Sequence, residues 1–465
     1  MRWHLSVAEG RMLDPISRAL LSRIFVLLLL SLALYRLPAF FDVSSPSSSG
    51  AASLLNARKS PAEKAAEVRF VTNSFLPQSF LSDDPSFLTK NGVPVIRILD
   101  NIPSLLPNYV PQFSTVEEGH FVTHLDGGYT VVWTVDPELQ TRIGKYIRGH
   151  RVPYGFFVAE NPKNGRLLAF WGSRYGKYDG SLILRATYPA ASLFKIITTT
   201  DALSQHKITP DTRIYFHGCL YCIGPAYWHN DRRRDRLEFT VAEALGRSIN
   251  TVFAKIALRY LSPNDLRETA SRYGFNHPIR SDLPIDQSHA DIPDDLNGFA
   301  FCSAGFGDVG ISPIHAAAIA GALSNDGVMM KPHMVEKILD RSGRVIFQDS
   351  PEYLSSVTSP TISKTMISMM RSTVIKGTGH RAFFRWRFNP KLRHILVSGK
   401  TGTLTGKNPA GHYVWFIGTA SNQDPTIAVA ALTIDQGIWT IKGPDIASKG
   451  MYTFFNEKHS DRYHG

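Results

Sequence analysis

A serine and a lysine stand three residues apart in the apolar segment YPAASLFKIITTT, which covers residues 188–200. The serine is Ser192 and the lysine is Lys195. Side chains at positions i and i+3 of a helix lie on one face, so this hydroxyl and this amine are expected to touch. A hydroxyl beside an amine is a nucleophile beside a base. The same spacing recurs at Ser204 and Lys207, so the pair does not identify a site by itself.

Two further short patterns supply more hydroxyls, an amide and a second amine. S-I-N at residues 248–250 follows the helical pattern FTVAEALGR, and K-T-G-T at residues 400–403 follows the apolar strand pattern HILVSG. Each pattern is weak alone. In the order S-x-x-K, S-x-N, K-T-G, they are typical of penicillin-binding proteins and class A β-lactamases.

From about residue 127 to residue 455 the chain resembles the transpeptidase domain of penicillin-binding proteins. TVDPELQ resembles that family's entry strand and turn, NPKNGRLLAF its following hairpin, and FTVAEALGRSINTVFAKIAL the helix and loop of its second motif. GFGDVGISPIHAAAIAGALSNDGVMMKPH and WFIGTA resemble its late helix and the strand after K-T-G. Residues 190 and 191 are alanines where the family often has proline and glycine, and small residues still permit close approach. We expect no glycosyltransferase domain ahead of this region, because the preceding residues leave too little room for one.

The resemblance implies a serine acyltransferase and gives four side chains catalytic roles. Ser192 is expected to attack the carbonyl between two terminal D-alanines of a peptidoglycan stem peptide. Lys195 takes the hydroxyl proton if it is neutral, and burial together with the charge of Lys400 is expected to lower its pKa. Ser248 is expected to relay the proton to the departing amine.

The remaining motif residues are expected to bind the substrate. Asn250 holds the substrate amide, and Thr401 with Thr403 binds its terminal carboxylate beside the second lysine. Gly402 lets the substrate backbone approach the strand closely. Backbone N–H groups of Ser192 and Thr403 are expected to stabilise the oxyanion. No metal or organic cofactor is required.

Apolar patterns predict the helices and strands that position these motifs. YTVVWTV and YGFFVAENPKNGRLLAFWG are predicted to be strands, and helical patterns dominate residues 191–261. HILVSGKTGT, YVWFIGTA and TIAVAALTID predict an antiparallel sheet. Strands are predicted early and late in this region, with helices between them. This order indicates an α/β (α+β) domain whose sheet is completed by strands from both ends of the region. The resemblance implies a penicillin-binding protein or serine β-lactamase-like fold, with an antiparallel sheet flanked by helices and an all-helical subdomain.

Composition and the N-terminal residues indicate the compartment. The chain has 465 residues and a net charge of +12, which suggests a polyanionic neighbourhood such as nucleic acid, an anionic membrane or a wall polymer. No zinc-finger, Rossmann or phosphate-loop pattern supports nucleic acid. Four arginines precede IFVLLLLSLALY at residues 24–35, which is short for a membrane span and also fits a cleaved signal. LPAFF extends the apolar stretch and no A-x-A follows it, so a single-pass signal anchor is favoured, with the remainder outside the cytoplasm.

These observations predict the following organisation and partners. Residues 1–41 form a cytoplasmic basic tail and membrane anchor, residues 42–60 a serine-rich linker, and residues 61–126 a juxtamembrane segment of unknown fold. The transpeptidase domain covers residues 127–457, and residues 458–465 form a tail. The expected location is the inner membrane, with the catalytic domain on the periplasmic side. Expected partners are peptidoglycan stem peptides, β-lactam antibiotics as covalent inhibitors, the membrane, and other cell-wall synthesis proteins.

Two alternatives stay open at this stage. The first is a serine β-lactamase, a β-lactam sensor or a D,D-carboxypeptidase. No E-x-x-L-N-like carboxylate follows S-I-N as in class A β-lactamases, and class D enzymes and sensors usually carry an aliphatic residue where Asn250 stands, so a transpeptidase is favoured. The second concerns Cys219 and Cys222. Together with nearby histidines they could bind zinc, but a local disulfide is favoured in an exported protein.

Overall fold

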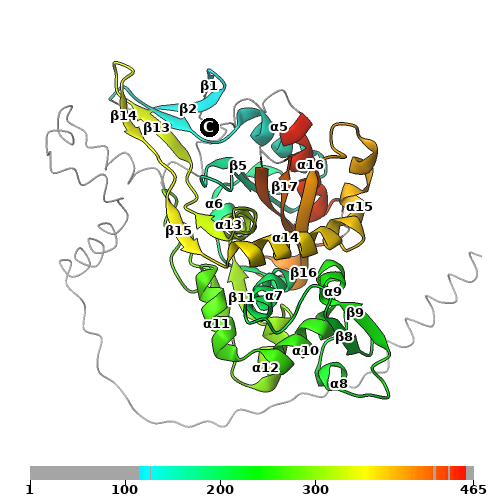
Figure 1. The fold of residues 1–465 in the computed structure, drawn as a ribbon. Coiled ribbons are helices and arrows are strands. Elements are labelled where there is room, and N and C mark those ends of the chain that lie inside the picture. The colour runs from blue at the N-terminus through cyan, green and yellow to red at the C-terminus, as the bar shows by residue number, and fades with distance from the viewer. Residues whose placement is uncertain (1–114, 126, 423–425, 438–439, 457–465) are drawn as a thin grey trace, which may run out of the picture. The chain divides into compact units, whose positions relative to one another are not determined.

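A six-stranded antiparallel sheet forms the centre of the protein (Figure 1). The structure is a computed structural model that describes residues 115–125, 127–422, 426–437 and 440–456. The order of the strands is β16-β17-β18-β4-β5-β6, and β18 pairs with β4 so that Val429 lies opposite Ala159. The prediction that both ends of the domain complete one sheet is therefore confirmed. The strands are β4 (Tyr154–Glu160), β5 (Leu167–Arg174), β6 (Lys177–Tyr178), β16 (Leu396–Lys407), β17 (Ala410–Ser421) and β18 (Thr426–Asp435).

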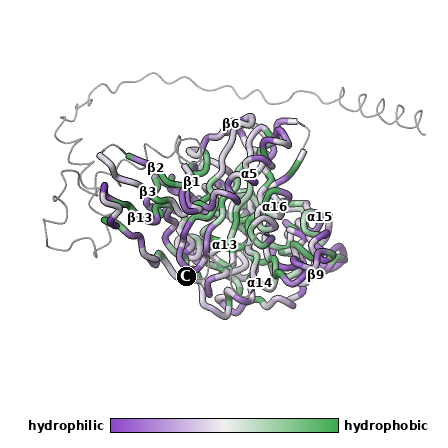
Figure 2. Tube along the Cα trace, turned by 90° about the horizontal axis from the view of Figure 1, so that it is seen from above, coloured by the Kyte–Doolittle hydropathy of each residue, from purple (hydrophilic) through white to green (hydrophobic). Residues whose placement is uncertain are grey.

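Both faces of this sheet are covered by helices and are hydrophobic. Alternate side chains of a strand point to opposite faces. Phe156 and Val158 of β4 accordingly join one core, whereas Phe157 and Ala159 join another. Figure 2 shows hydrophobic stretches of the chain running through the interior of the described part. One face packs against α13, and the other packs against α5 and α16. These helices are α5 (Pro137–Gly149), α13 (Pro313–Ser324) and α16 (Gly443–Asn456).

A mainly helical part surrounds α7, in which every residue from Lys195 to Leu203 is buried. Helices α10, α11 and α14 pack against α7. This part also contains the short strand pair β8–β9 and the three strands β10-β11-β7, which the apolar patterns did not reveal. The helices are α6 (Ser181–Leu184), α7 (Lys195–Ser204), α8 (Pro225–Trp228), α9 (Val241–Arg247), α10 (Asn250–Tyr260), α11 (Pro263–Arg272), α12 (Leu296–Ser303) and α14 (Pro360–Ile375). The strands are β7 (Tyr188–Pro189), β8 (Arg213–Phe216), β9 (Leu237–Thr240), β10 (His289–Asp291) and β11 (Asp308–Ile311).

A second sheet of five strands has the order β1-β2-β3-β13-β14, and β12 pairs with β15. Val122 of β2 lies opposite Val132 of β3, so this sheet extends to the N-terminal side of residue 127. The strands are β1 (Thr115–Glu117), β2 (His120–Leu125), β3 (Tyr129–Trp133), β12 (Val328–Met330), β13 (Val335–Leu339), β14 (Val345–Gln348) and β15 (Tyr353–Ser356). The expected anchor, serine-rich linker and C-terminal tail lie outside the described residues. None of the helices in the described ranges is long and apolar enough to cross a membrane.

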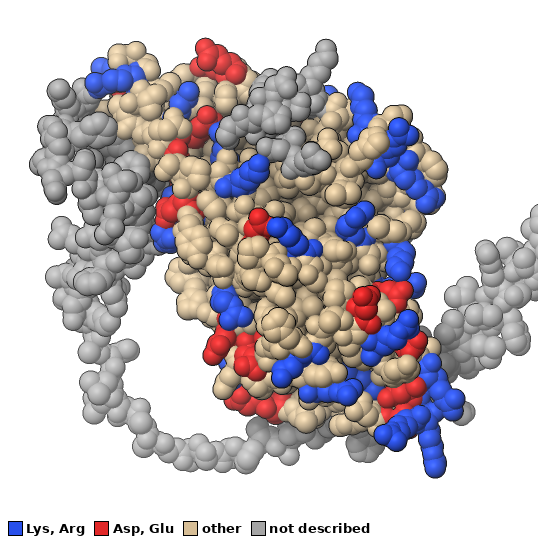
Figure 3. Space-filling view, in the orientation of Figure 1, with Lys and Arg blue, Asp and Glu red and all other residues tan. Residues whose placement is uncertain are grey.

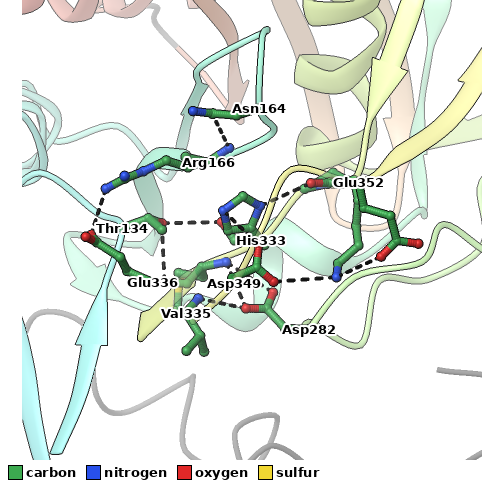
Figure 4. Close-up of polar contacts among 12 residues, drawn as sticks. Thr134, Asn164, Arg166, Asp282, His333, Val335, Glu336, Asp349 and Glu352 are labelled. Atoms are coloured by element: carbon green, nitrogen blue, oxygen red, sulfur yellow. Dashed lines mark hydrogen bonds and ion pairs between the residues drawn. The ribbon is translucent and has the colours of Figure 1, made fainter. Parts of the chain in front are cut away.

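A network of polar contacts links the five-stranded sheet to the rest of the domain (Figure 4). The carboxylate of Asp282 accepts the backbone N–H of Met334 at 2.9 Å and that of Val335 at 2.7 Å. Arg166, next to β5, donates to Glu336 of β13 at 2.7 Å. The two contacts of Asp282 satisfy backbone donors at the start of β13 that would otherwise be costly to bury.

Candidate active site

Ser192 and Lys195 lie at the N-terminal end of α7, where the chain enters through the 3-10 helix η2 (Ala191–Phe194). The Nζ atom of Lys195 lies 2.7 Å from the Oγ atom of Ser192, so the expected contact between the two side chains is confirmed. Ser192 is partly exposed, whereas Lys195 is fully buried. The nucleophile is thus accessible to a substrate while its neighbouring amine is kept from water.

The second S-x-x-K pattern is not part of this arrangement. Ser204 is the last residue of α7, and its hydroxyl lies 3.5 Å from that of Thr358. Twelve residues of helix at 1.5 Å each separate Ser204 from Ser192 by about 18 Å. Lys207 is exposed to solvent.

The backbone just before the nucleophile adopts an unusual conformation. Ala191 has a φ of 51°, in the left-handed region that favours glycine. Gly305 packs closely against this turn, and a Cβ atom there would lie 2.4 Å from the carbonyl oxygen of Ala191. Trp415 donates from Nε1 to the carbonyl of Pro189 at 2.9 Å. Neighbouring elements therefore hold the turn in place. The family's glycine would be favoured at residue 191 for its backbone conformation as well as for its small size.

Lys195 is surrounded by hydrogen-bond acceptors. Its Nζ atom donates to Oδ1 of Asn250 at 2.9 Å and to the carbonyl of Ala304. Burial, and secondarily the positive charge of Lys400, hold the pKa of Lys195 well below its ordinary value of 10.5. A neutral amine has two N–H groups for these two oxygens and one lone pair, which is then free to accept the Ser192 proton.

Lys400 forms a second group of contacts with the S-I-N motif. Its Nζ atom donates to Oγ of Ser248 and to the carbonyl of Thr401, each at 2.8 Å. Ser248 itself has a φ of 58° where α9 ends. Burial lowers the pKa of Lys400 to about 7. Among the described residues, no carboxylate is hydrogen-bonded to Lys400 or Lys195, so nothing there offsets the unfavourable effect of the Lys400 charge on the charged form of Lys195.

The loop of residues 219–222 fixes the position of Asn250. Cys219 and Cys222 form a disulfide with a Cα–Cα distance of 5.0 Å, which confirms the favoured alternative for these cysteines. The Nδ2 atom of Asn250 donates to the carbonyl of Tyr221 at 2.8 Å. Next to it, the hydroxyl of Thr251 donates to the carbonyl of Cys222 at 2.9 Å. Because these acceptors are backbone atoms, no sequence motif reveals them.

The K-T-G residues lie on β16, which is an edge strand of the central sheet and packs against η2. A Cβ atom at Gly402 would lie 3.1 Å from the carbonyl oxygen of Ala190, so glycine keeps the strand close to η2. The hydroxyl of Thr401 is hydrogen-bonded to that of Thr378, a residue that the sequence reasoning missed. The side chain of Thr403 is exposed.

The structure therefore brings the predicted site residues together from three separate segments. Hydrogen bonds connect Ser192, Lys195 and Asn250 in one group and connect Ser248, Lys400 and Thr401 in another. The electrostatic effect of Lys400 on Lys195 links the two groups. Of the positions that sequence reasoning missed, Gly305 begins a recognisable pattern, the glycine turn GFGDVG, and Ala304 directly precedes it.

An accessible serine hydroxyl beside a buried amine, at the edge of an antiparallel sheet flanked by helices, places a nucleophile next to a base. The chain belongs to the penicillin-binding protein transpeptidase domain family, whose family model matches residues 155–448.

Curated and solved relatives are consistent with this membership. The chain is 28% identical over 274 residues to peptidoglycan D,D-transpeptidase PbpA of Mycolicibacterium smegmatis, covering 54% of this chain and 50% of that protein. It is 27% identical over 326 residues to stage V sporulation protein D of Bacillus subtilis, covering 65% and 49%. A crystal structure of the D,D-transpeptidase domain of a peptidoglycan glycosyltransferase from Eggerthella lenta aligns with a TM-score of 0.59 and 25% identity, covering 70% of this chain and 82% of that one. The chain spans about half the length of the curated relatives it matches.

Proposed function

We propose that the protein is a peptidoglycan D,D-transpeptidase that cross-links stem peptides through an acyl-enzyme on Ser192. The observation that carries the proposal is the 2.7 Å contact between the accessible Ser192 hydroxyl and the fully buried amine of Lys195. A buried amine with a lowered pKa is the base that a serine hydroxyl needs. The name D,D-transpeptidase of the mycobacterial relative supports the choice of substrate.

Acylation proceeds in two steps. The Oγ atom of Ser192 forms a bond to the carbonyl carbon between the two D-alanines, and its proton moves to Nζ of Lys195. The carbonyl oxygen becomes negative, and backbone N–H groups of Ser192 and Thr403 stabilise it. The C–N bond then breaks, and the leaving D-alanine amine takes the proton from Lys195. The hydroxyl of Ser248, held at 2.8 Å by Lys400, relays that proton.

Substrate binding relies on the second lysine and the edge strand. Protonated Lys400 attracts the terminal carboxylate of the stem peptide, which the hydroxyls of Thr401 and Thr403 also contact. Asn250 holds the substrate amide, and Gly402 leaves room for the substrate backbone beside β16. A bound carboxylate favours the charged form of Lys400, so its pKa rises above about 7 in the complex.

The second half of the reaction is the reverse, with an amine of another stem peptide as the acceptor. It attacks the ester on Ser192, loses its proton through the same groups and leaves a new peptide bond. Among the described residues no carboxylate contacts Ser192 or Lys195, so no carboxylate is placed to activate water as in a class A β-lactamase.

The identity of the acceptor tests the proposal. The full chain is offered penicillin and, separately, a thioester mimic of the acyl-D-alanine end, with and without a D-amino acid. We expect a burst of about one product per serine with penicillin, followed by slow release. We expect continued thioester turnover that rises when the D-amino acid is added. Sustained penicillin hydrolysis without an acceptor effect would instead identify a β-lactamase, and thioester turnover to water alone a carboxypeptidase.

The location and domain organisation stay proposals as well. We propose that residues 24–41 anchor the chain in the inner membrane, with the catalytic domain on the periplasmic side and other wall-synthesis proteins as partners. An apolar anchor does not depend on charge, so the protein should remain with membranes in high salt. Soluble exported protein with a new N-terminus beyond residue 41 would show a cleaved signal.

A further inference from the structure

One surface of the described part of the chain is basic and is formed by a stretch of sequence that lacks acidic residues. Between Glu352 and Asp424 the sequence contains no aspartate or glutamate. Within this stretch, α15 (His380–Phe383) and the 3-10 helix η3 (Phe384–Phe388) connect α14 to β16. Six exposed basic side chains of this region form what we call the basic patch: Arg371, Arg381, Arg385, Arg387, Lys391 and Arg393.

The described residues do not neutralise the charges of the basic patch. None of its six side chains forms an ion pair with a carboxylate of the residues that the structure describes, whereas the nearby Lys376 pairs with Glu243 at 3.0 Å. In Figure 3, Lys and Arg side chains gather without acidic ones among them over the region where Figure 1 shows α15. Unpaired, clustered cations attract an anionic partner.

Large hydrophobic side chains are exposed in the same stretch of the chain. Phe388 is 68% exposed, and Ile375, Phe384 and Leu396 are also exposed. The guanidinium of Arg387 lies over the rings of Phe384 and Phe388, with its carbon 3.7 Å and 4.7 Å from their centres. Such side chains without polar tips are costly to leave in water unless a partner covers them.

A hollow of about 230 Å³ lies within this surface. Phe384, Leu392 and Ile395 contribute apolar lining, and Arg371, Arg387 and Arg393 line the same hollow. Apolar lining next to guanidinium groups suits a partner that carries hydrocarbon and negative charge side by side.

We propose that the basic patch, with its four exposed hydrophobic residues, docks the catalytic domain onto an anionic phospholipid bilayer. Phosphate groups of the lipids pair with the arginines, and the phenyl rings and aliphatic tips enter the boundary between headgroups and acyl chains. A soluble polyanion would use the charges but would leave Phe388, Ile375 and Leu396 in water. The proposal does not depend on the acyl-transfer reaction.

The patch is close to the proposed active site. Leu396 begins β16 four residues before Lys400, a distance of about 13 Å along a strand. The adjoining Thr378 contacts Thr401 directly. Docking would therefore fix the orientation of the catalytic edge strand relative to the bilayer.

The full chain allows a direct test by site-specific labelling. Cys219 and Cys222 are joined and Cys302 is buried, so a cysteine introduced by Phe388→Cys is the exposed thiol to label with an environment-sensitive dye. Tyr353→Cys is the matched control, because Tyr353 is 54% exposed but lies on β15. Both proteins are reconstituted into vesicles of phosphatidylcholine with or without phosphatidylglycerol.

We expect the dye at residue 388, and not at residue 353, to shift its emission to shorter wavelength in phosphatidylglycerol vesicles only, with quenching by spin-labelled lipids. Each basic residue near an anionic surface raises the ratio of docked to undocked protein about fivefold. Arg385→Glu combined with Arg387→Glu should therefore lower this ratio at least about 25-fold. Penicillin labelling of Ser192 checks that this variant is folded. No shift at residue 388, or equal shifts at both sites, overturns the proposal. A shift caused by poly-glutamate but not by phosphatidylglycerol would also overturn it and would identify a surface for wall polyanions.

Discussion

The positive charge of Lys400 on β16 acts on the amine of Lys195 on α7, and both lysines are fully buried. Burial and this repulsion favour the neutral form of Lys195, which is the form that can accept the Ser192 proton. Lys400 has the opposite requirement, because only its charged form attracts a carboxylate. The proposed reaction thus needs one lysine neutral and the other charged at the same time.

The acylation rate should therefore depend on pH in a bell-shaped manner. As the pH rises, Lys195 loses its proton and the rate increases, and above about 7 Lys400 begins to lose its proton and the rate decreases. The second-order rate of acylation by penicillin, measured by stopped flow from acid to alkaline pH, gives both limbs. In Lys400→Ala the alkaline limb should disappear and the rate should fall by about two orders of magnitude. An unchanged alkaline limb in that variant would contradict the role of Lys400.

The two S-x-x-K serines should differ completely in their reaction with penicillin. Ser192→Ala should abolish covalent labelling by a fluorescent penicillin, since no other accessible hydroxyl contacts a buried amine in the described part of the chain. Ser204→Ala is the matched control, because its serine has the same spacing to a lysine but ends α7 near Thr358. Labelling is read after denaturing electrophoresis. Persistent labelling of Ser192→Ala would disprove the assignment of the nucleophile.

The disulfide should affect the reaction through Asn250. Replacing Cys219 and Cys222 by serine frees the loop whose carbonyls hold Asn250 and Thr251. We expect the acylation rate to fall about tenfold or more, because small displacements of a positioning group are costly. The free energy of unfolding should fall by about 2 kcal/mol, as for a short closed loop.

A control separates positioning from loss of folding. The double cysteine variant is compared with the unmodified protein at a temperature well below both unfolding transitions, where each is folded. Asn250→Ala in both backgrounds completes a double-mutant cycle. If the loop acts through Asn250, the cysteine replacements should have little further effect once the amide is gone. Additive effects would show that the disulfide acts elsewhere.

The sequence predicted the central sheet and the main catalytic contacts because both depend on side-chain pattern. The apolar runs of β4 and β18 and the i,i+3 spacing of Ser192 and Lys195 are local signals. The short strands β8 and β9 were missed because four-residue segments carry little periodicity. The carbonyls of Ala304 and Tyr221 were missed because any residue supplies a carbonyl, and only the tertiary fold brings it to the site. Thr378 carries no motif and reaches Thr401 from the loop after α14.

The conformation of Ala191 gives a prediction about stability. Its φ of 51° is costly for a residue with a Cβ atom, so Ala191→Gly should relieve this cost. Glycine also increases the entropy of the unfolded chain, and the net gain in the free energy of unfolding should be about 0.5–1 kcal/mol. The neighbouring Ala190 has a φ of −65°, which suits alanine, so Ala190→Gly should lower the free energy of unfolding by about 0.5–1 kcal/mol. Urea unfolding of both variants measures the two changes, and a loss of stability in Ala191→Gly equal to that in Ala190→Gly would refute the left-handed conformation before the nucleophile.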